Sequence, residues 1–310
     1  MNTLREAIDD YLMMRRALGF KLTRVGGKLK HFADFLESHG ADTITTLLAR
    51  QWAMQPPEAK PATWAERLMH VRVFARYRQA ADPRTEIPPA GLLPFRAERA
   101  KPYFYSEAEI HRLLAAAEAL PPKDGLRGAT YHCLFGLLVV TGMRISEVLA
   151  LKHDDVDLTQ GILIVRGTKF DKSRLLPLHR STQQVLVEYA RKRDARFPRP
   201  TTPHFLVSDG GRPLEGSTVR RTFYALSRAI GLRGADDSYG PRLHDFRHRF
   251  ARETLVRWYR AGEEVERRLP VLSTYLGHAH VSDTYWYLSA CPELMGEARR
   301  RLEKRWEGYP

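Results

Sequence analysis

Prolines divide this chain into two parts that are expected to fold separately. A stretch with no long periodic pattern of apolar residues is interrupted by Pro83, Pro88, Pro89, Pro94 and Pro102. Proline lacks a backbone donor and fixes φ, so such a stretch is typical of a stiff linker. A chain of 310 residues is long enough to form two cores. The sequence therefore predicts an N-terminal domain over residues 1–82, a linker over 83–103 and a C-terminal domain over 104–310.

The N-terminal part is predicted to be entirely helical. Apolar residues recur three and four positions apart throughout residues 1–81, for example in LREAIDDYLMMRRAL and LKHFADFLESH. This period indicates amphipathic helices. Four such segments are present, so we expect a small four-helix bundle.

The C-terminal part mixes helices with a short pair of strands. YHCLFGLLVV is apolar on every side and predicts a buried helix, while Ser106 and Glu109 have the spacing of a capping box. ILIVRG and RLLPL alternate like the strands of a hairpin. The expected fold class is mainly α with a small β-sheet (α+β). Further helices are predicted at about 181–196, 217–230, 243–261, 265–276, 282–288 and 292–306.

The charge of the chain indicates a polyanionic partner. The 50 Lys and Arg against 36 Asp and Glu give a net charge of +14, with an excess of +5 before residue 100 and +9 after it. Two basic domains on an extended linker can close around a DNA duplex from opposite sides. A membrane partner is the rival interpretation. It is disfavoured because no apolar run approaches the ~18 to 20 residues of a spanning helix.

The remaining composition favours a reducing compartment. Cys133 and Cys291 are the only cysteines, which excludes a disulfide framework and a cysteine metal site. The N-terminal MNTLREAIDD lacks the layout of a signal peptide. We therefore expect a cytoplasmic protein.

Two segments carry residues suited to phosphate chemistry. Metal-free cleavage of a nucleic-acid strand requires a nucleophile, cations for the phosphate oxygens and an acid for the leaving oxygen. Arginine is the best of these cations because its planar fork meets two oxygens at once. In TGMRISEVLAL, a glycine turn opens an amphipathic helix, and Arg144 taken alone would be an ordinary solvated residue. TYLGHAHVSDTYWYL packs two histidines and three tyrosines into fifteen residues.

A third segment, RLHDFRHRFA, brings histidine and arginine together. His244 and Arg247 lie one turn apart on one face of the predicted helix. His244 and His248 have the spacing of metal ligands, but no third ligand is evident. We therefore do not expect a zinc site, and His248 is interpreted as a structural or solvent-facing neighbour.

The order of these segments resembles the tyrosine recombinase family, also called phage integrases. That order is TGMRISEVLAL, the hairpin GTKFDKSRLLPL, HDFRH, LGH, and then Tyr287 nine residues after His278. The resemblance covers roughly residues 104–290. The helical N-terminal part is more weakly similar to the family's core-binding, DNA-contacting domain. The resemblance implies a tyrosine-recombinase catalytic domain that ends in a docking helix.

The resemblance also implies how the scissile phosphate is held. Arg144 and Arg247 correspond to the two phosphate-clamping arginines, with His244 beside them. His278 corresponds to the residue that hydrogen-bonds the scissile phosphate. Glu147, one turn after Arg144, matches an acidic position that supports the site without reacting.

The reacting groups follow from the same comparison. Tyr287 corresponds to the nucleophile, whereas Tyr285 and Trp286 are interpreted as packing or flanking groups. Lys169 resembles the general acid for the departing 5′ oxygen, and Lys172 is the competing choice. The predicted catalytic set is therefore Arg144, Lys169, His244, Arg247, His278 and Tyr287, with no metal and no other cofactor.

The implied function is site-specific DNA recombination. Family members cleave and rejoin strands through a 3′-phosphotyrosine link, in integration, excision or transposition. The expected partners are double-stranded DNA with inverted-repeat sites and further recombinase subunits, in a homotetramer or a mixed assembly. A type IB topoisomerase and a non-catalytic DNA-binding protein are the alternatives. The intact set of six side chains disfavours the second of these.

The tail favours assembly over monomeric relaxation of DNA. PELMGEARRRLEKRW shows an apolar stripe that must be buried somewhere, formed by Leu294, Met295, Ala298, Leu302 and Trp306. Packing on its own domain is one possibility. The resemblance implies the other, docking on a neighbouring subunit.

Overall fold

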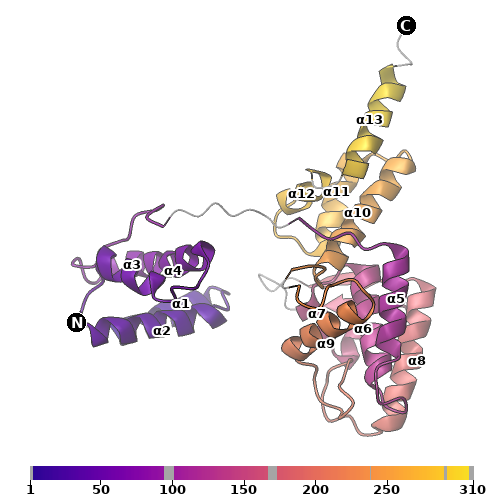
Figure 1. The fold of residues 1–310 in the computed structure, drawn as a ribbon, viewed down its shortest axis with the longest axis horizontal. Helices are drawn as coiled ribbons and strands as arrows, with labels where there is room; N and C mark the ends of the chain where they lie inside the picture. Colours follow the sequence, from indigo (N-terminus) through magenta and orange to yellow (C-terminus); the bar gives the residue numbers. More distant parts are fainter. Residues whose placement is uncertain (1–2, 94–100, 167–172, 238, 290–291, 307–310) are drawn as a thin grey trace. The chain divides into compact units, whose positions relative to one another are not determined.

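The chain divides into two compact units. A computed structural model describes residues 3–93, 101–166, 173–237, 239–289 and 292–306 (Figure 1). The units are Met1–Ala100 and Lys101–Pro310. None of the helices described combines the length and the apolar composition of a membrane-spanning segment.

The first unit contains the four predicted helices. They are α1 (Leu4–Ala17), α2 (Thr23–Ser38), α3 (Thr46–Met54) and α4 (Pro61–Gln79). The α1 helix starts at a capping box, in which Thr3 and Glu6 satisfy each other's backbone donors. The apolar faces of the four helices meet in one core, where Phe32, Trp52 and Phe74 are fully buried. Burial of each such ring stabilises the bundle by roughly 1.5 to 3 kcal/mol.

The second unit is built around a buried helix. The predicted apolar helix is α6 (Arg127–Thr141), which contacts α5 (Glu107–Glu118), α8 (Arg180–Arg196) and α10 (Asp245–Arg260). The capping box predicted at Ser106 and Glu109 starts α5 and is confirmed. The other helices lie within two residues of their predicted bounds where a prediction was made. They are α7 (Ile145–Ala150), α9 (Gly216–Ala229), α11 (Val265–Leu276), α12 (Ser282–Ser289) and α13 (Pro292–Trp306).

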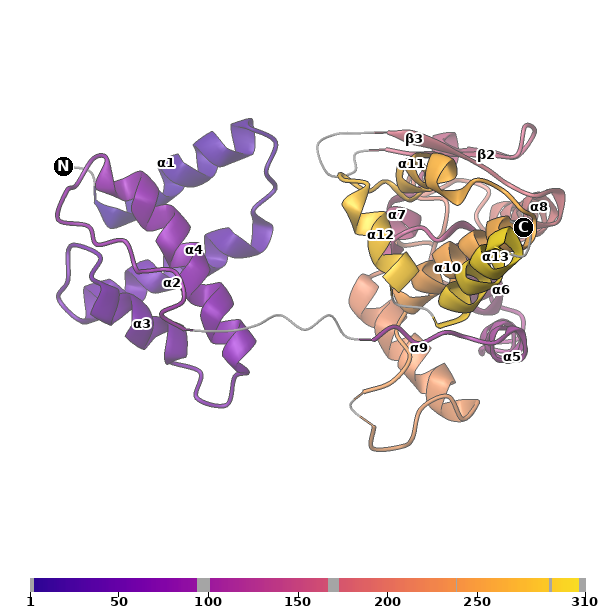
Figure 2. The same cartoon turned by 90° about the horizontal axis from the view of Figure 1, so that it is seen from above.

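The predicted hairpin forms the larger part of a three-stranded antiparallel sheet. Strand β2 (Ile162–Val165) pairs with β3 (Arg174–Pro177), and the register opposes Val165 to Arg174. A third strand, β1 (Val156–Asp157), was not predicted, because two residues are too few to show a period. It follows a 3₁₀ turn, His153–Asp155. Figure 2 shows β3 beside α11. Arg174, the first residue of β3, contacts the end of that helix through the Tyr275 carbonyl.

A separate hydrophobic cluster supports the C-terminal helices. It joins apolar residues of α10 and α11 to Tyr287 of α12 and Leu294 of α13. The cluster fixes α12 against α10 and α11. This packing positions Tyr287 beside residues that are far away in the sequence.

Candidate active site

The C-terminal ends of two helices meet at the centre of the site, and each helix is followed by a glycine. The α6 helix ends at Gly142 and α11 ends at Gly277, both in the left-handed conformation with φ of 61° and 68°. A Cβ at Gly142 would lie 2.8 Å from Phe250 Cδ1, and one at Gly277 would lie 2.7 Å from Arg174 Nη1. Both positions therefore require glycine for conformation and for space. The last carbonyls of each helix are left without helical donors and carry partial negative charge.

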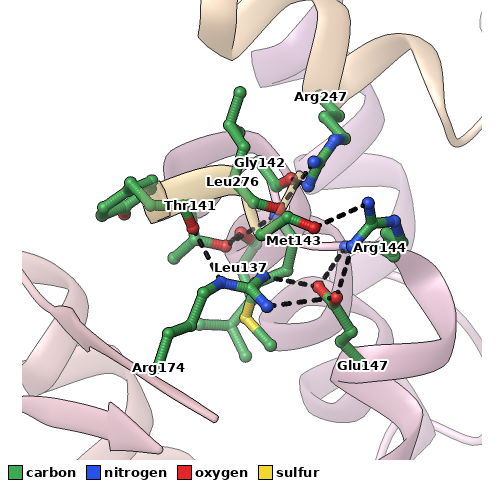
Figure 3. Close-up of polar contacts among 11 residues, drawn as sticks. Leu137, Thr141, Gly142, Met143, Arg144, Glu147, Arg174, Arg247 and Leu276 are labelled. Atoms are coloured by element: carbon green, nitrogen blue, oxygen red, sulfur yellow. Dashed lines mark hydrogen bonds and ion pairs between the residues drawn. The ribbon is translucent and has the colours of Figure 1, made fainter. Parts of the chain in front are cut away.

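Arg247 bridges these two helix ends. Its guanidinium donates through Nη1 to the Gly142 carbonyl at 2.9 Å and through Nη2 to the Leu276 carbonyl at 2.6 Å (Figure 3). The residue is only 2% exposed. The pKa of Arg247 is lowered to about 10, chiefly by burial of the side chain and next by the positive charge of Arg144. Arg247 is therefore a buried cation that stays charged at neutral pH.

Arg144 contacts the end of α11 from a more exposed position. It is the N-cap residue of α7, two residues after Gly142. Its Nη2 donates to the Gly277 carbonyl at 3.1 Å, and its Nη1 donates to Glu147 Oε1 at 2.9 Å. The side chain is 36% exposed, in contrast to that of Arg247. Arg144 is thus anchored at one end of the site and accessible to a substrate.

Glu147 is shared by Arg144 and a residue that the sequence did not single out, Arg174 of β3. Arg174 donates through Nη2 to Glu147 Oε2 at 2.8 Å and through Nη1 to Oε1 at 3.2 Å. Burial acts to raise the pKa of Glu147, but hydrogen bonds from Arg174 and from the Arg144 backbone outweigh it and hold that pKa below its ordinary value. The strand period could have identified Arg174. Arg174 lies on the same, inward face of β3 as buried Leu176. A guanidinium on a buried face requires a carboxylate to balance its charge.

Tyr287 is buried among aromatic rings and cations. Its ring lies 5.4 Å from the ring of His248 and 6.0 Å from that of His278, centroid to centroid. Burial raises the pKa of Tyr287, whereas the charge and hydrogen bonding of Arg247 act in the opposite direction. The phenol is therefore neutral at rest, beside the group best suited to stabilise its anion.

The histidines around Tyr287 are neutral at pH 7. Burial, followed by the Arg247 charge, lowers the pKa of His278 to about 4, and its Nδ1 shares a 2.7 Å hydrogen bond with Thr284 Oγ1. Burial, followed by His244, lowers the pKa of His248 to about 4. His244 is exposed as a residue, but its ring is partly desolvated. This desolvation, followed by the Arg247 charge, lowers the pKa of His244. A neutral imidazole can accept a proton, and burial makes His278 and His248 weaker bases than a free imidazole.

Five of the six predicted residues lie in one region of the second unit. Gly277 and the end of α11 connect Arg144, Arg247 and His278, while His244 approaches Tyr287 through the intervening ring of His248. The sixth, Lys169, and its competitor Lys172 lie outside the described residues.

The neighbouring aromatic residues separate into different environments. Tyr285 is 53% exposed, and Tyr275 stacks on Phe250 with ring centroids 5.4 Å apart. Trp286 packs against His248, at 4.9 Å between ring centroids. Among the described residues, no three His, Cys, Asp or Glu side chains are grouped so that they could hold a metal ion.

Comparison with known proteins identifies the family. The model of the phage integrase family matches residues 104–293, which is more than half of the chain. The chain belongs to the phage integrase family of tyrosine recombinases. Members of this family are site-specific recombinases, so the chain is an enzyme of DNA recombination. Neither a topoisomerase nor a non-catalytic binder is favoured.

Similar phage integrase family proteins match over nearly the full chain. "Putative integrase/recombinase y4rB" of Sinorhizobium fredii is 56% identical over 311 aligned residues, covering 99% of this chain and 99% of that protein. The tyrosine recombinase XerD of Caulobacter vibrioides is 32% identical, covering 92% of each chain.

Solved structures of family proteins share the mainly α fold with a small sheet. The Tn1549 transposon integrase, solved with transposon right end DNA, has a TM-score of 0.66 at 16% identity and covers 98% of this chain and 99% of its own. A lambda integrase tetramer bound to a Holliday junction has a TM-score of 0.58 at 20% identity, over 90% of this chain and 78% of its own. At these identities the likeness establishes the fold alone, and it confirms the predicted fold class.

Proposed function

We propose that the chain cleaves and rejoins DNA strands through a 3′-phosphotyrosine intermediate on Tyr287. The observation that carries this proposal is a buried, neutral phenol beside a buried arginine that stays charged at neutral pH. A nearby cation favours the phenolate that must attack phosphorus.

In the proposed cleavage step, Tyr287 Oη bonds to the scissile phosphorus and the bond from phosphorus to the 5′ oxygen breaks. The phenolic proton passes to a neutral histidine. His244 is the candidate, and the ring of His248, which lies between His244 and Tyr287, would relay the proton. Lys169 gives a proton to the departing 5′ oxygen. Arg144 and Arg247 neutralise the charge that builds on the non-bridging oxygens. Because one phosphodiester replaces another, rejoining is the reverse reaction and needs neither ATP nor metal.

The covalent link provides the direct test and also the route to a substrate. Purified protein is incubated in EDTA with a pool of duplexes of randomised sequence, then denatured, and the protein-bound DNA is captured and sequenced. We expect enrichment of sequences with inverted repeats, joined to the protein by a 3′-phosphate. An absolute need for Mg²⁺, or no denaturation-resistant adduct, would refute the mechanism. The recovered duplex, called the captured site below, serves in the experiments that follow.

The general acid can be assigned with a modified leaving group. We expect Lys169→Met to slow adduct formation by about 10²- to 10⁴-fold on the captured site, since proton transfer typically contributes that much. A duplex with sulfur in place of the scissile 5′ oxygen should restore the rate, because a thiolate leaves without protonation. Lys172→Met is the matched control and should show no such rescue. The opposite pattern would assign the role to Lys172.

The partners follow from the charge and from the similar structures. The lambda integrase neighbours hold DNA as dimers and tetramers, which supports a multimeric DNA complex for this chain. We propose a homotetramer, or a mixed recombinase assembly, on inverted-repeat sites in integration, excision or transposition of a mobile element. The first unit would serve as the core-binding domain. A DNA substrate would also account for the expected cytoplasmic localisation.

The C-terminal helix supports this assembly. At its start, Leu294 is buried in the cluster that contains Tyr287, and Arg260 of α10 pairs with Glu293 and Glu297. Beyond this start, the predicted apolar stripe is not buried. Met295, Leu302 and Trp306 are all exposed, with Trp306 at 69%. We propose that these residues dock on a neighbouring recombinase subunit when two DNA sites come together.

Changing the exposed part of this stripe tests the docking. We expect the double variant Leu302→Ser, Trp306→Ser to bind one captured site normally and to lose the two-site complex in a gel-shift assay. Because both side chains are exposed, the free energy of unfolding should change by about 0.5 kcal/mol or less. Arg299→Ser, an exposed change on the same helix, is the control. Retention of the two-site complex would indicate that α13 packs only on its own subunit.

A further inference from the structure

We propose that Arg174 is a positioning residue that keeps Arg144 available to the DNA phosphate by sharing the charge of Glu147. This inference rests on the proposed function, in which Arg144 contacts the scissile phosphate. The observation behind it is a carboxylate held between two guanidinium groups in a site that is mostly closed to water (Figure 3).

The geometry favours Arg174 as the main partner of the carboxylate. Arg174 meets both oxygens of Glu147, at 2.8 and 3.2 Å, whereas the Arg144 side chain meets one, at 2.9 Å. The third donor of the Arg174 fork, Nε, donates to the Tyr275 carbonyl at 2.7 Å. Arg174 and Glu147 are 9% and 8% exposed, so their pairing is weakly screened by solvent. Arg174 is thus fixed at every end of its guanidinium.

The consequence for Arg144 is electrostatic. A lone carboxylate beside Arg144 would cancel its charge and compete with a phosphate for its donors. With Arg174 present, the three groups carry one net positive charge, and the most exposed of the three is Arg144. The surplus charge therefore lies where a phosphate can reach it. Glu147 can then orient Arg144 without neutralising it.

A purely structural role is the competing explanation. Arg174 begins β3, and its bond to the Tyr275 carbonyl ties the hairpin to the end of α11. Arg174 Nη1 also occupies the space that a Cβ at Gly277 would enter, at 2.7 Å. Loss of Arg174 could therefore loosen the hairpin, and the test must separate this effect from loss of charge.

A substrate without charge at the scissile linkage separates the two roles. Adduct formation is measured in single turnover at saturating protein, on the captured site with a normal phosphate and with a neutral methylphosphonate at the cleaved position. We compare wild type, Arg174→Met, and Arg174→Met combined with Glu147→Gln. Arg166→Met is the control, because Arg166 follows the neighbouring strand β2 and pairs with a different carboxylate, Asp155.

We expect Arg174→Met to slow adduct formation on the phosphate by about 10- to 100-fold, by analogy with the loss of a group that orients a metal ligand. On the methylphosphonate the deficit should shrink to within about threefold of wild type, because less charge remains to be neutralised. Adding Glu147→Gln should recover about tenfold on the phosphate, since it removes the competing carboxylate. Arg166→Met should match wild type on both substrates.

Each other outcome is decisive. An equal deficit on both substrates would assign Arg174 a purely structural role, and a rate within twofold of wild type would remove it from the site. If Arg174→Met fails to fold, Arg174→Lys keeps the charge and should react within about tenfold of wild type. A slower Arg174→Lys would overturn the inference. No adduct from wild type would instead refute the proposed function, and this inference with it.

Discussion

Replacing Tyr287 with phenylalanine is expected to abolish the covalent protein–DNA adduct while duplex binding stays within about twofold of wild type. The change removes only the nucleophilic oxygen. The ring keeps its packing against His248, Trp286 and His278, so the C-terminal cluster should remain folded. The measurements are adduct formation after denaturation and equilibrium binding to the captured site.

The control for this change is Tyr285→Phe. Tyr285 lies on the same helix, two residues away, and is exposed, so its hydroxyl is available to solvent and tests whether any nearby phenol can react. We expect Tyr285→Phe to form the adduct at the wild-type rate. Loss of the adduct in Tyr285→Phe and its survival in Tyr287→Phe would reverse the assignment.

Removing either arginine of the proposed phosphate clamp, Arg144 or Arg247, should produce the second large effect. We expect Arg144→Ala and Arg247→Ala each to slow single-turnover adduct formation by about 10²- to 10³-fold, or ~2.7 to 4 kcal/mol, by analogy with the loss of one oxyanion donor. Arg→Lys at either position should recover only part of this loss, because an ammonium cannot grip two oxygens as a fork does. Rates close to wild type in either alanine variant would exclude that residue from the site.

The two arginines should differ in their effect on stability. Arg247 is buried and satisfies two helix-end carbonyls, so Arg247→Ala leaves both without a donor and opens a cavity. Unsatisfied buried groups cost about 1 to 3 kcal/mol each, so we expect a lower free energy of unfolding in urea. Arg144 is more exposed, and Arg144→Ala should cost less. Equal losses of stability would contradict the bridging role of Arg247.

The sequence predicted local structure well where local chemistry determines it. The α11 helix has the predicted bounds, because its end depends on Gly277, a residue that accepts the left-handed conformation easily. The start of α5 was equally predictable from Ser106 and Glu109. These features depend on residues within one or two helical turns.

Contacts across long sequence separations could not be predicted in the same way. In the sequence, Arg174 looks like an ordinary strand residue. Its pairing with Glu147 could not be predicted, because Glu147 lies 27 positions earlier and on another element. Nor did the sequence reveal that Tyr287 is buried, because DTYWYL presents several aromatic residues with no period that separates them. The candidate site residues came from the order of motifs. Their partners became evident only from tertiary structure.

The way in which the two arginines of the proposed phosphate clamp are held also bears on the protein during its synthesis. Arg247 and Arg144 depend on carbonyls that lie 29 and 133 residues further along the chain, at Leu276 and Gly277. A nascent chain that has not yet emerged to the end of α11 lacks both anchors, and Tyr287 comes later still. Partly synthesised molecules, and fragments truncated before this point, should therefore be unable to nick DNA. Under the proposed mechanism, the arrangement would confine strand breakage to chains whose catalytic unit is complete.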